Sequence, residues 1–243
     1  MAMTEQRATD GRRARGDASR RIVLDAAADL ASLEGLDGLS IGRLASAASV
    51  SKSGIATLFG SKEQLQLATV AAATERFTAT VIVPARVQPR GIRRLTALLD
   101  CVVAYSQDRV FPGGCFFSAA AADFHAKAGP VRDALADQLE SWMGYISASA
   151  RYAIELGELP GLDDPDQLAF ELQGTFEWMN LMAVIRESDV HYVRARRAYR
   201  DRLVSLGADP AIAELLLTPG AALDAIEAPR APGATGASVA PGR

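Results

Sequence analysis

Residues 40–63 read SIGRLASAASVSKSGIATLFGSKE, the stretch with the clearest structural pattern in the chain. Ile41 and Leu44 open one set of apolar residues at helical spacing, and Ile55 opens a second set after a break at Ser49-Val50. Each set is long enough for about two helical turns. The pattern predicts two short helices joined by a tight turn, which is the outline of a helix-turn-helix.

Capping residues mark the ends of these helices. Ser40 and Ser51 each precede an apolar set and can serve as helix N-caps. Gly60 follows the second set, as a glycine after a helix C-terminus commonly does. Ser61 then stands three residues before Gln64, the spacing of a capping box, and this predicts a third helix directly afterwards.

The outward positions of the second helix are Lys52, Ser53, Ala56 and Thr57. Small and hydroxyl-bearing side chains can approach base edges and a thymine methyl group closely. Lys62, in the first turn of the next helix, opposes the helix dipole, and a phosphate beside it would explain its position. The sequence therefore predicts DNA binding, and the alternative is a helical hairpin in a bundle with Lys62 in solvent.

From about Ser19 to Thr80 the chain resembles the DNA-binding domain of the TetR family of bacterial transcriptional regulators. The matching segments are Arg20–Glu34, Gly35, Ile41–Ala48, Val50-Ser51-Lys52 and Phe59-Gly60-Ser61-Lys62-Glu63. The resemblance implies DNA contacts at the matching positions Ser40, Arg43, Ser51, Lys52, Ser53, Ala56, Thr57 and Lys62. Three positions depart from the family pattern: Ser49 replaces a turn glycine, Ala56 a frequent tyrosine, and Leu58 a frequent histidine.

Charge is concentrated unevenly along the chain. Residues 1–62 carry a net charge of +2, whereas the whole chain carries −3, so the basic character lies at the N-terminal end. Arg12, Arg13 and Arg15 predict either a DNA-contacting arm or a solvated tail. Arg20 and Arg21, at the start of the first helix, are expected to reach phosphates. That helix should bury a stripe over Ile22, Ala26, Leu30 and Leu33.

The rest of the chain is also predicted to be helical, so the fold class is all-α. Apolar periodicity and Pro or Gly punctuation predict helices over about 62–81, 92–107, 131–156, 165–185 and 190–206, with a short helix after FPGGC at 111–115. We expect four segments: a flexible basic arm over 1–18, a helix-turn-helix domain over 19–64, a regulatory and dimerisation domain over 65–207, and a mostly disordered tail over 208–243.

The body is similar to TetR-type regulatory domains of actinobacterial-type members, on the FPGGCFF stretch, Asp123-Phe124 and Gly129-Pro130-Val131-Arg132. This resemblance implies a homodimer, a palindromic operator and a small hydrophobic effector. More than one face of the 165–185 helix is apolar, which independently suits a dimer. The residues expected to line the effector pocket are Tyr105, Phe116, Phe117, Trp142, Tyr145, Phe176 and Met179, and the alternative for each is ordinary packing in the core.

Other features narrow the function classes. No apolar run is long enough for a membrane span, and the N-terminus has no apolar core of a secretory signal, so no membrane association is expected. Two cysteines outside any metal spacing fit a reduced cytoplasm. We find no catalytic or metal-ligating set and expect no cofactor. The alternative function is an all-helical binding protein or enzyme with a vestigial helix-turn-helix.

Overall fold

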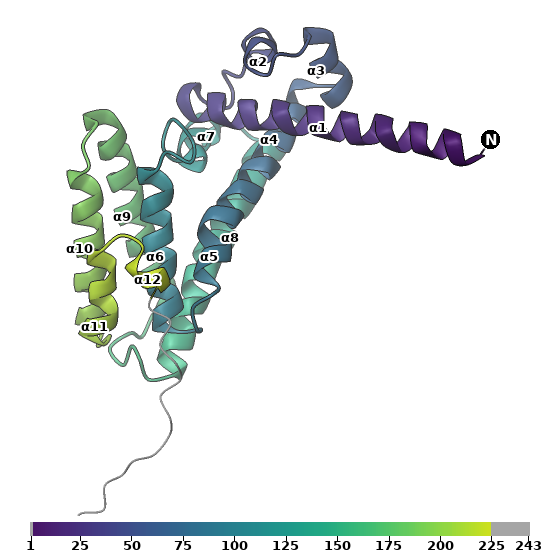
Figure 1. Ribbon diagram of the computed structural model, residues 1–243. Coiled ribbons are helices and arrows are strands. Elements are labelled where there is room, and N and C mark those ends of the chain that lie inside the picture. Colours follow the sequence, from purple (N-terminus) through teal and green to yellow (C-terminus); the bar gives the residue numbers. More distant parts are fainter. Residues whose placement is uncertain (1, 225–243) are drawn as a thin grey trace, which may run out of the picture.

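The computed structural model describes residues 2–224, with side chains from Gly16 onward. Helices α1 (Ala2–Glu34), α2 (Ile41–Ala47) and α3 (Lys52–Phe59) form a head at one end of the molecule (Figure 1). Within the described residues, helices are joined by turns, one isolated β-bridge links Phe111 and Gly114, and no strand occurs. The all-α fold class is confirmed.

Local capping explains where the head helices begin and end. Ser51 Oγ accepts a hydrogen bond from Gly54 N at 3.0 Å, and Ser61 Oγ accepts one from Gln64 N at 3.1 Å. Gly60 ends α3 with φ +73°, in the left-handed region. Ser40 occupies the N-cap position of α2, but its hydroxyl makes no cap hydrogen bond, which corrects the capping role expected for it.

A long connector joins the head to the body. Helix α4 (Lys62–Phe77) continues without a break into a π-helical segment, η1 (Thr78–Ile82), and then into α5 (Val83–Ala85). The connector runs alongside α8 from the head into the body (Figure 1). π-Helical segments inside α-helices occur frequently at functional sites.

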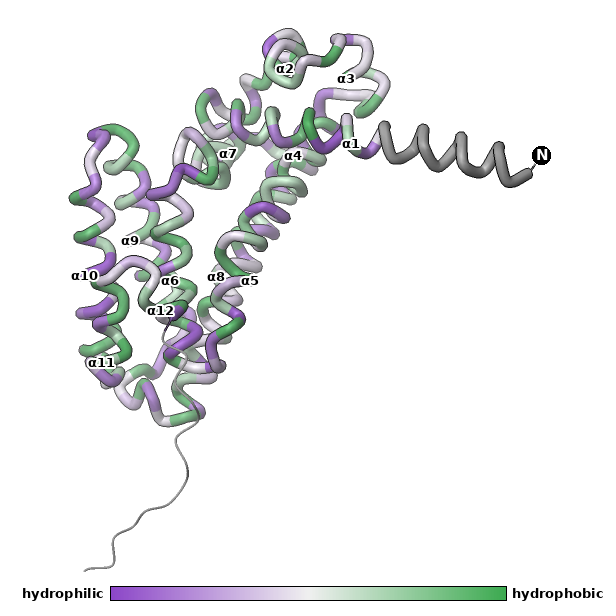
Figure 2. The backbone as a smooth tube through the Cα atoms, viewed as in Figure 1, coloured by the Kyte–Doolittle hydropathy of each residue, from purple (hydrophilic) through white to green (hydrophobic). Residues whose placement is uncertain are grey.

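The remaining helices build the body around the connector. Their bounds are α6 (Ile92–Gln107), α7 (Phe116–Phe124), α8 (Pro130–Glu155), α9 (Pro165–Arg186), α10 (Val190–Ser205), α11 (Pro210–Ala213), the 3₁₀ turn η2 (Glu214–Leu217) and α12 (Ala221–Asp224). Hydrophobic and hydrophilic residues alternate along most of these helices, as amphipathic packing requires (Figure 2).

Two cores share α1 and α4 between them. In α1, Val23 and Ala27 belong to the head core, whereas Ala28 and Ala31 belong to the body core. In α4, Leu65 lies in the head core, and residues from Val70 onward lie in the body core. The head is therefore packed onto the body by two helices that both units use.

The structure differs from the sequence prediction at both ends. Helix α1 begins at Ala2, so the segment expected as a flexible arm is helical over residues 2–18, and the side chains of Arg12, Arg13 and Arg15 lie outside the described part. The tail is ordered up to Asp224, since Ala213, Leu216 and Ala222 are buried against the body. Residues 225–243 of the expected tail lie outside the described residues.

The predicted stripe on α1 is only partly correct: Ala26 and Leu30 pack against the head core, but the other two members do not. Ile22 and Leu33 are more than half exposed, at 55% and 59%, whereas Val23, Ala27 and Ala31 are fully buried. Small alanines let neighbouring helices approach closely, so the smaller side chains were selected for the inner face. Apolar size alone therefore misplaced Ile22 and Leu33, where the structure buries Val23, Ala27 and Ala31 instead.

Candidate nucleic-acid interface and effector pocket

Helix α3 presents one polar face to solvent. Ile55 and Phe59 anchor it in the head core, with exposed fractions of 1% and 7%. The four residues expected to read DNA, Lys52, Ser53, Ala56 and Thr57, are all exposed. Figure 1 places α2 and α3 at the outer end of the head, beyond α1. This is the geometry that a recognition helix needs in order to enter a major groove.

The hydroxyls of α3 already have local hydrogen-bond partners. Thr57 Oγ1 donates to Ser53 O at 2.8 Å, and Ser53 Oγ lies 3.1 Å from Ser51 Oγ. A hydroxyl that donates inward keeps lone pairs for an outside donor. Thr57 can therefore offer an acceptor and a methyl group to a base edge.

Two of the arginines expected to bind DNA are engaged within the chain. Arg20 Nη1 donates to Leu58 O at 2.9 Å, and its guanidinium lies 4.5 Å from the ring centre of Phe59, so it ties α1 to α3. Arg43 forms an ion pair with Glu34. Arg21 is exposed at the side of α1. Arg20 is thus placed to orient the head, whatever it contributes to DNA contact.

Lys62 has a partner that the sequence did not suggest. Lys62 Nζ donates to Asp37 O at 2.6 Å and lies 3.7 Å from the Asp37 carboxylate, which also accepts from Lys127 Nζ at 2.8 Å. The hydrogen bond from Lys127 is the main cause that lowers the pKa of Asp37, and Lys62 adds to it. A phosphate is therefore not needed to explain a lysine at this helix start. The cluster instead joins the head to the body.

Six of the seven expected pocket residues are buried in the body. They are Tyr105, Phe116, Phe117, Trp142, Phe176 and Met179. Sequence reasoning missed Phe77, which lies among them: its ring centre is 5.2 Å from Tyr105, 5.8 Å from Phe117 and 5.1 Å from Trp142, edge to face in each case. Because Phe77 is the last residue of α4, the aromatic cluster touches the connector directly.

The space beside this cluster is small and has a polar edge. A cavity of about 20 Å³, room for about one water, is bordered by Phe77, Trp142 and Phe176. Trp142 Nε1 donates to Gln173 Oε1 at 2.9 Å, and Gln173 Nε2 donates to Glu177 Oε1 at 2.7 Å. A larger groove of about 510 Å³ lies between α7 and α9 and shares Glu177 with the cavity.

Tyr145, the seventh residue, lies elsewhere. It lines a separate groove beside Arg86, away from the aromatic cluster. Its phenol oxygen accepts a hydrogen bond from Arg86 Nε at 3.2 Å. The structure thus removes Tyr145 from the set that surrounds Phe77.

The cysteines and histidines show no reactive or metal-binding arrangement in the described part of the chain. Burial raises the pKa of the Cys101 thiol to about 12 and also raises the pKa of Cys115, which disfavours the thiolates that redox sensing needs. Among residues 16–224, His, Cys, Asp and Glu form no cluster that could hold a metal ion. No described helix is both long and apolar enough to cross a bilayer.

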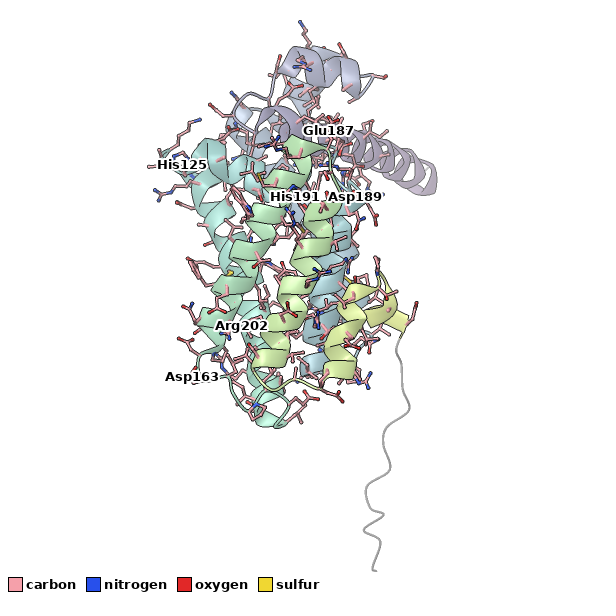
Figure 3. All side chains as sticks on the ribbon, turned by 90° about the vertical axis from the view of Figure 1, so that its left-hand side faces the viewer. His125, Asp163, Glu187, Asp189, His191 and Arg202 are labelled. Atoms are coloured by element: carbon pink, nitrogen blue, oxygen red, sulfur yellow. The ribbon has the colours of Figure 1, made fainter. Side chains whose placement is uncertain are left out.

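A broad apolar face remains uncovered on α9 and α10. On α9, Phe170, Trp178 and Ile185 are 67%, 63% and 63% exposed, and on α10 Val193 is 55% exposed. Figure 3 looks onto these two helices, which lie side by side. A contiguous exposed apolar face is typical of a protein–protein contact.

Comparison with known families matches both parts of the chain. Residues 23–69 match the family described as bacterial regulatory proteins, tetR family, and residues 91–199 match the tetracyclin repressor-like C-terminal domain. The two matches cover the head and most of the body. No curated protein matches the chain.

Solved structures give the same fold. A TetR transcriptional regulator from Chloroflexus aurantiacus is 26% identical with a TM-score of 0.70, over 79% of this chain and 94% of that one. A TetR-family regulator from Agrobacterium tumefaciens is 16% identical with a TM-score of 0.71, over 79% and 100%. AibR, in complex with isovaleryl coenzyme A and operator DNA, is 20% identical with a TM-score of 0.59, over 79% and 98%.

Proposed function

The chain belongs to the TetR family of bacterial transcriptional regulators, and from that premise we propose that it is a homodimeric repressor released from a palindromic operator by a small hydrophobic ligand. The observation that carries the proposal is the exposed polar face of α3, on a head that is packed onto a body with a groove large enough for a small molecule. AibR, a structural neighbour, was solved with both a small molecule and operator DNA, and this supports the same pairing of partners here.

In the proposed complex, α3 enters the major groove, and some of its residues contact bases while others contact phosphates. Thr57 and Ser53 contact base edges through hydroxyl lone pairs, and Ala56 permits close approach. Lys52, at the exposed start of α3, contacts phosphates together with Ser40, Ser51 and Arg21. Arg20 and Arg43 hold the head helices in position through their internal partners.

The exposed face of α9 and α10 supports the homodimer. A twofold axis through this face would bury Phe170, Trp178 and Ile185 against the partner's copies and form a four-helix contact. Two heads related by a twofold axis read two half-sites of a palindrome, about one helical turn of DNA apart. The palindromic operator therefore follows from the proposed dimer, because both have the same twofold symmetry.

Release is proposed to act through Phe77. A hydrophobic ligand that enters between α7 and α9 can reach the aromatic cluster only by separating its rings, because the cavity there holds about 20 Å³. Phe77 would then move with α4, which carries the head. The ligand favours the expanded body, and the spacing of the two α3 helices no longer matches the operator.

We propose no catalytic role and expect the protein to work in the cytoplasm, beside the DNA. The alternative function is that of a helical binding protein or enzyme with a vestigial head. It predicts no sequence-specific DNA binding, whereas the repressor predicts specific binding that weakens as salt rises.

The test is selection of bound sites from a random DNA pool with the purified protein. A palindrome is the expected result, and no enrichment at low salt would favour the alternative function. On the selected site, Thr57→Val should alter sequence preference, since it removes the acceptor and keeps the shape. Lys52→Met should weaken binding to all sequences and reduce the salt slope by about one. Arg132→Met, on the exposed start of α8, should change neither property and serves as the control.

A further inference from the structure

A groove of about 460 Å³ lies between the turn that precedes α6 and the C-terminal half of α8. Figure 1 shows this end of α8 at the end of the body away from α2 and α3. Its lining includes three arginines and two tyrosines: Arg86, Arg90, Arg94, Tyr145 and Tyr152. The volume falls within the range of small-molecule sites, roughly 300–1,000 Å³.

The groove carries positive charge without a matching carboxylate. Among the described residues, none of these three arginines forms an ion pair. Arg94 is held by neutral carbonyls instead: Nε and Nη2 donate to Gln88 O at 3.1 and 2.9 Å, and Nη2 also lies 3.3 Å from Arg86 O. Because carbonyls do not neutralise a guanidinium, Arg94 keeps its full charge at a fixed position.

The two tyrosines orient the other two arginines. Arg86 Nε donates to the Tyr145 hydroxyl at 3.2 Å, and its guanidinium lies 5.6 Å from that ring centre. Arg90 Nη1 donates to the Tyr152 hydroxyl, with its guanidinium 4.8 Å from the ring centre. Each phenol oxygen accepts from an arginine, so each keeps its own proton to donate to an outside acceptor.

An acidic side chain, Glu158, lies beside Gly91 at the edge of the groove. Glu158 Oε2 accepts a hydrogen bond from Ile92 N at 2.8 Å, which caps the start of α6 behind Gly91. Gly91, with φ +98°, lies in the lining, whereas Glu158 does not. Glu158 therefore holds the α6 N-terminus, and its single carboxylate offsets at most one of the three arginine charges, so the groove keeps a net positive charge.

We propose that this groove binds a small phosphate-bearing anion, with a diphosphate as the preferred group. Guanidinium groups match phosphate oxygens in geometry and charge, and phenol protons supply further donors. Three positive charges in one groove are neutralised better by a diphosphate than by a single carboxylate. A concave site of this volume fits a small molecule, and it lies at the opposite end of the body from the recognition helices.

The groove is also linked to the head through the connector helix. Arg86 follows α5, the last part of the connector that begins at Lys62, and the π-helical segment lies between them. An anion that draws Arg86 and Arg90 toward α8 would fix the far end of this connector. Its influence on operator binding rests on the proposed function, whereas binding in the groove does not.

The test is titration calorimetry of the full-length protein with inorganic pyrophosphate at constant ionic strength. Saturable binding is expected, with the affinity reduced about tenfold or more in a protein that carries Arg86→Gln and Arg90→Gln. Arg132→Gln, elsewhere on α8, is the matched control and should bind as the unaltered protein does. Thermal unfolding without pyrophosphate confirms that the double variant is folded.

The possible results distinguish anion binding in the groove from its influence on DNA binding. No saturable binding, or equal affinity in the double variant, overturns the site. Tighter binding of citrate than of pyrophosphate overturns the phosphate assignment, and a loss of affinity for random duplex DNA in the double variant marks a nucleic-acid patch instead. Pyrophosphate binding that leaves affinity for the selected DNA unchanged supports the site and overturns its regulatory effect.

Discussion

Replacing Trp178 by glutamate should convert the proposed dimer into monomers. Trp178 is 63% exposed in the single subunit, on the apolar face of α9. A large aromatic side chain covers about 150–250 Å² when it is buried, so about 100–160 Å² of Trp178 is left for a partner to cover. At about 25 cal/mol per Å², covering it contributes about 2.5–4 kcal/mol per subunit.

Twofold symmetry counts this contribution twice, so the substitution removes about 5–8 kcal/mol of association free energy, before the cost of burying two carboxylates. Each 1.4 kcal/mol is a factor of ten, so the dimer dissociation constant should rise more than a thousandfold. Sedimentation velocity over a range of protein concentrations measures this change directly.

Leu156→Glu is the matched control, because Leu156 is 60% exposed but lies at the end of α8, outside the α9–α10 face. It should leave the dimer intact. The Trp178→Glu variant should also lose affinity for the palindrome while each subunit stays folded, with a lower melting temperature because the partner no longer stabilises it. A variant that stays dimeric at micromolar concentration would refute the assignment of this face.

Three further predictions concern stability. Ser49→Gly should raise the free energy of unfolding by about 0.5–1 kcal/mol, because Ser49 has φ +55° and glycine adopts this region without strain; urea unfolding measures the gain. Arg196→Met should lower the free energy of unfolding by about 3–5 kcal/mol, because Arg196 is 3% exposed and its loss leaves Asp100 charged and buried without its partner; chemical denaturation measures the loss. Asp37→Asn should cost under about 1 kcal/mol near neutral pH, because the contact with Lys127 is half exposed, and this cost should vanish in acid.

Each of these has an outcome that would contradict it. Ser46→Gly, inside α2, should destabilise, and a gain there equal to that at Ser49 would show that backbone strain is not the cause. Adding Asp100→Leu to Arg196→Met should recover most of the loss, since a buried pair can be replaced by apolar residues. If recovery fails, the loss comes from packing or from the hydrogen bond that Gly220 N donates to Asp100, and not from the unpaired charge.

The pH dependence of the stability contributed by Asp37 follows from the lowered pKa of its carboxyl in the folded protein. The unfolded carboxyl titrates near about 3.9, and the folded one below that value. The contact therefore stabilises the fold fully above the unfolded pKa, and the stabilisation is lost as the pH falls through the folded pKa. The difference in stability between Asp37→Asn and the unaltered protein should shrink as the pH falls below about 3.9, and a difference that grows in acid would reverse the assignment.

The residues that could be predicted from sequence are those whose signals are local. The two head helices, the caps at Ser51 and Ser61 and the glycine end at Gly60 follow from residues within a few positions of one another. The bounds of α6 and α9 were predicted within one residue for the same reason. The left-handed backbone at Ser49 has no such local signal, because serine rarely adopts a positive φ.

Tertiary structure decided which side chains meet. Nothing local indicates that Arg20 reaches Leu58, that Lys62 shares Asp37, or that Phe77 lies among the rings of α6 to α8. The inner face of α1 was predicted only in part, because close approach of the helices buries Val23, Ala27 and Ala31 and leaves the larger Ile22 and Leu33 exposed.

The groove near Arg86 also depends on contacts that local sequence does not reveal. Arg86 lies 59 residues from Tyr145, and Arg90 lies 62 residues from Tyr152, so their pairing depends on the packing of α8 against the connector. Helical period and capping act over one or two turns, and local sequence is therefore enough to predict the helices, the head and the family. Which charges are neutralised, which rings touch and which faces stay exposed depend on helix packing angles, and only the folded chain sets these.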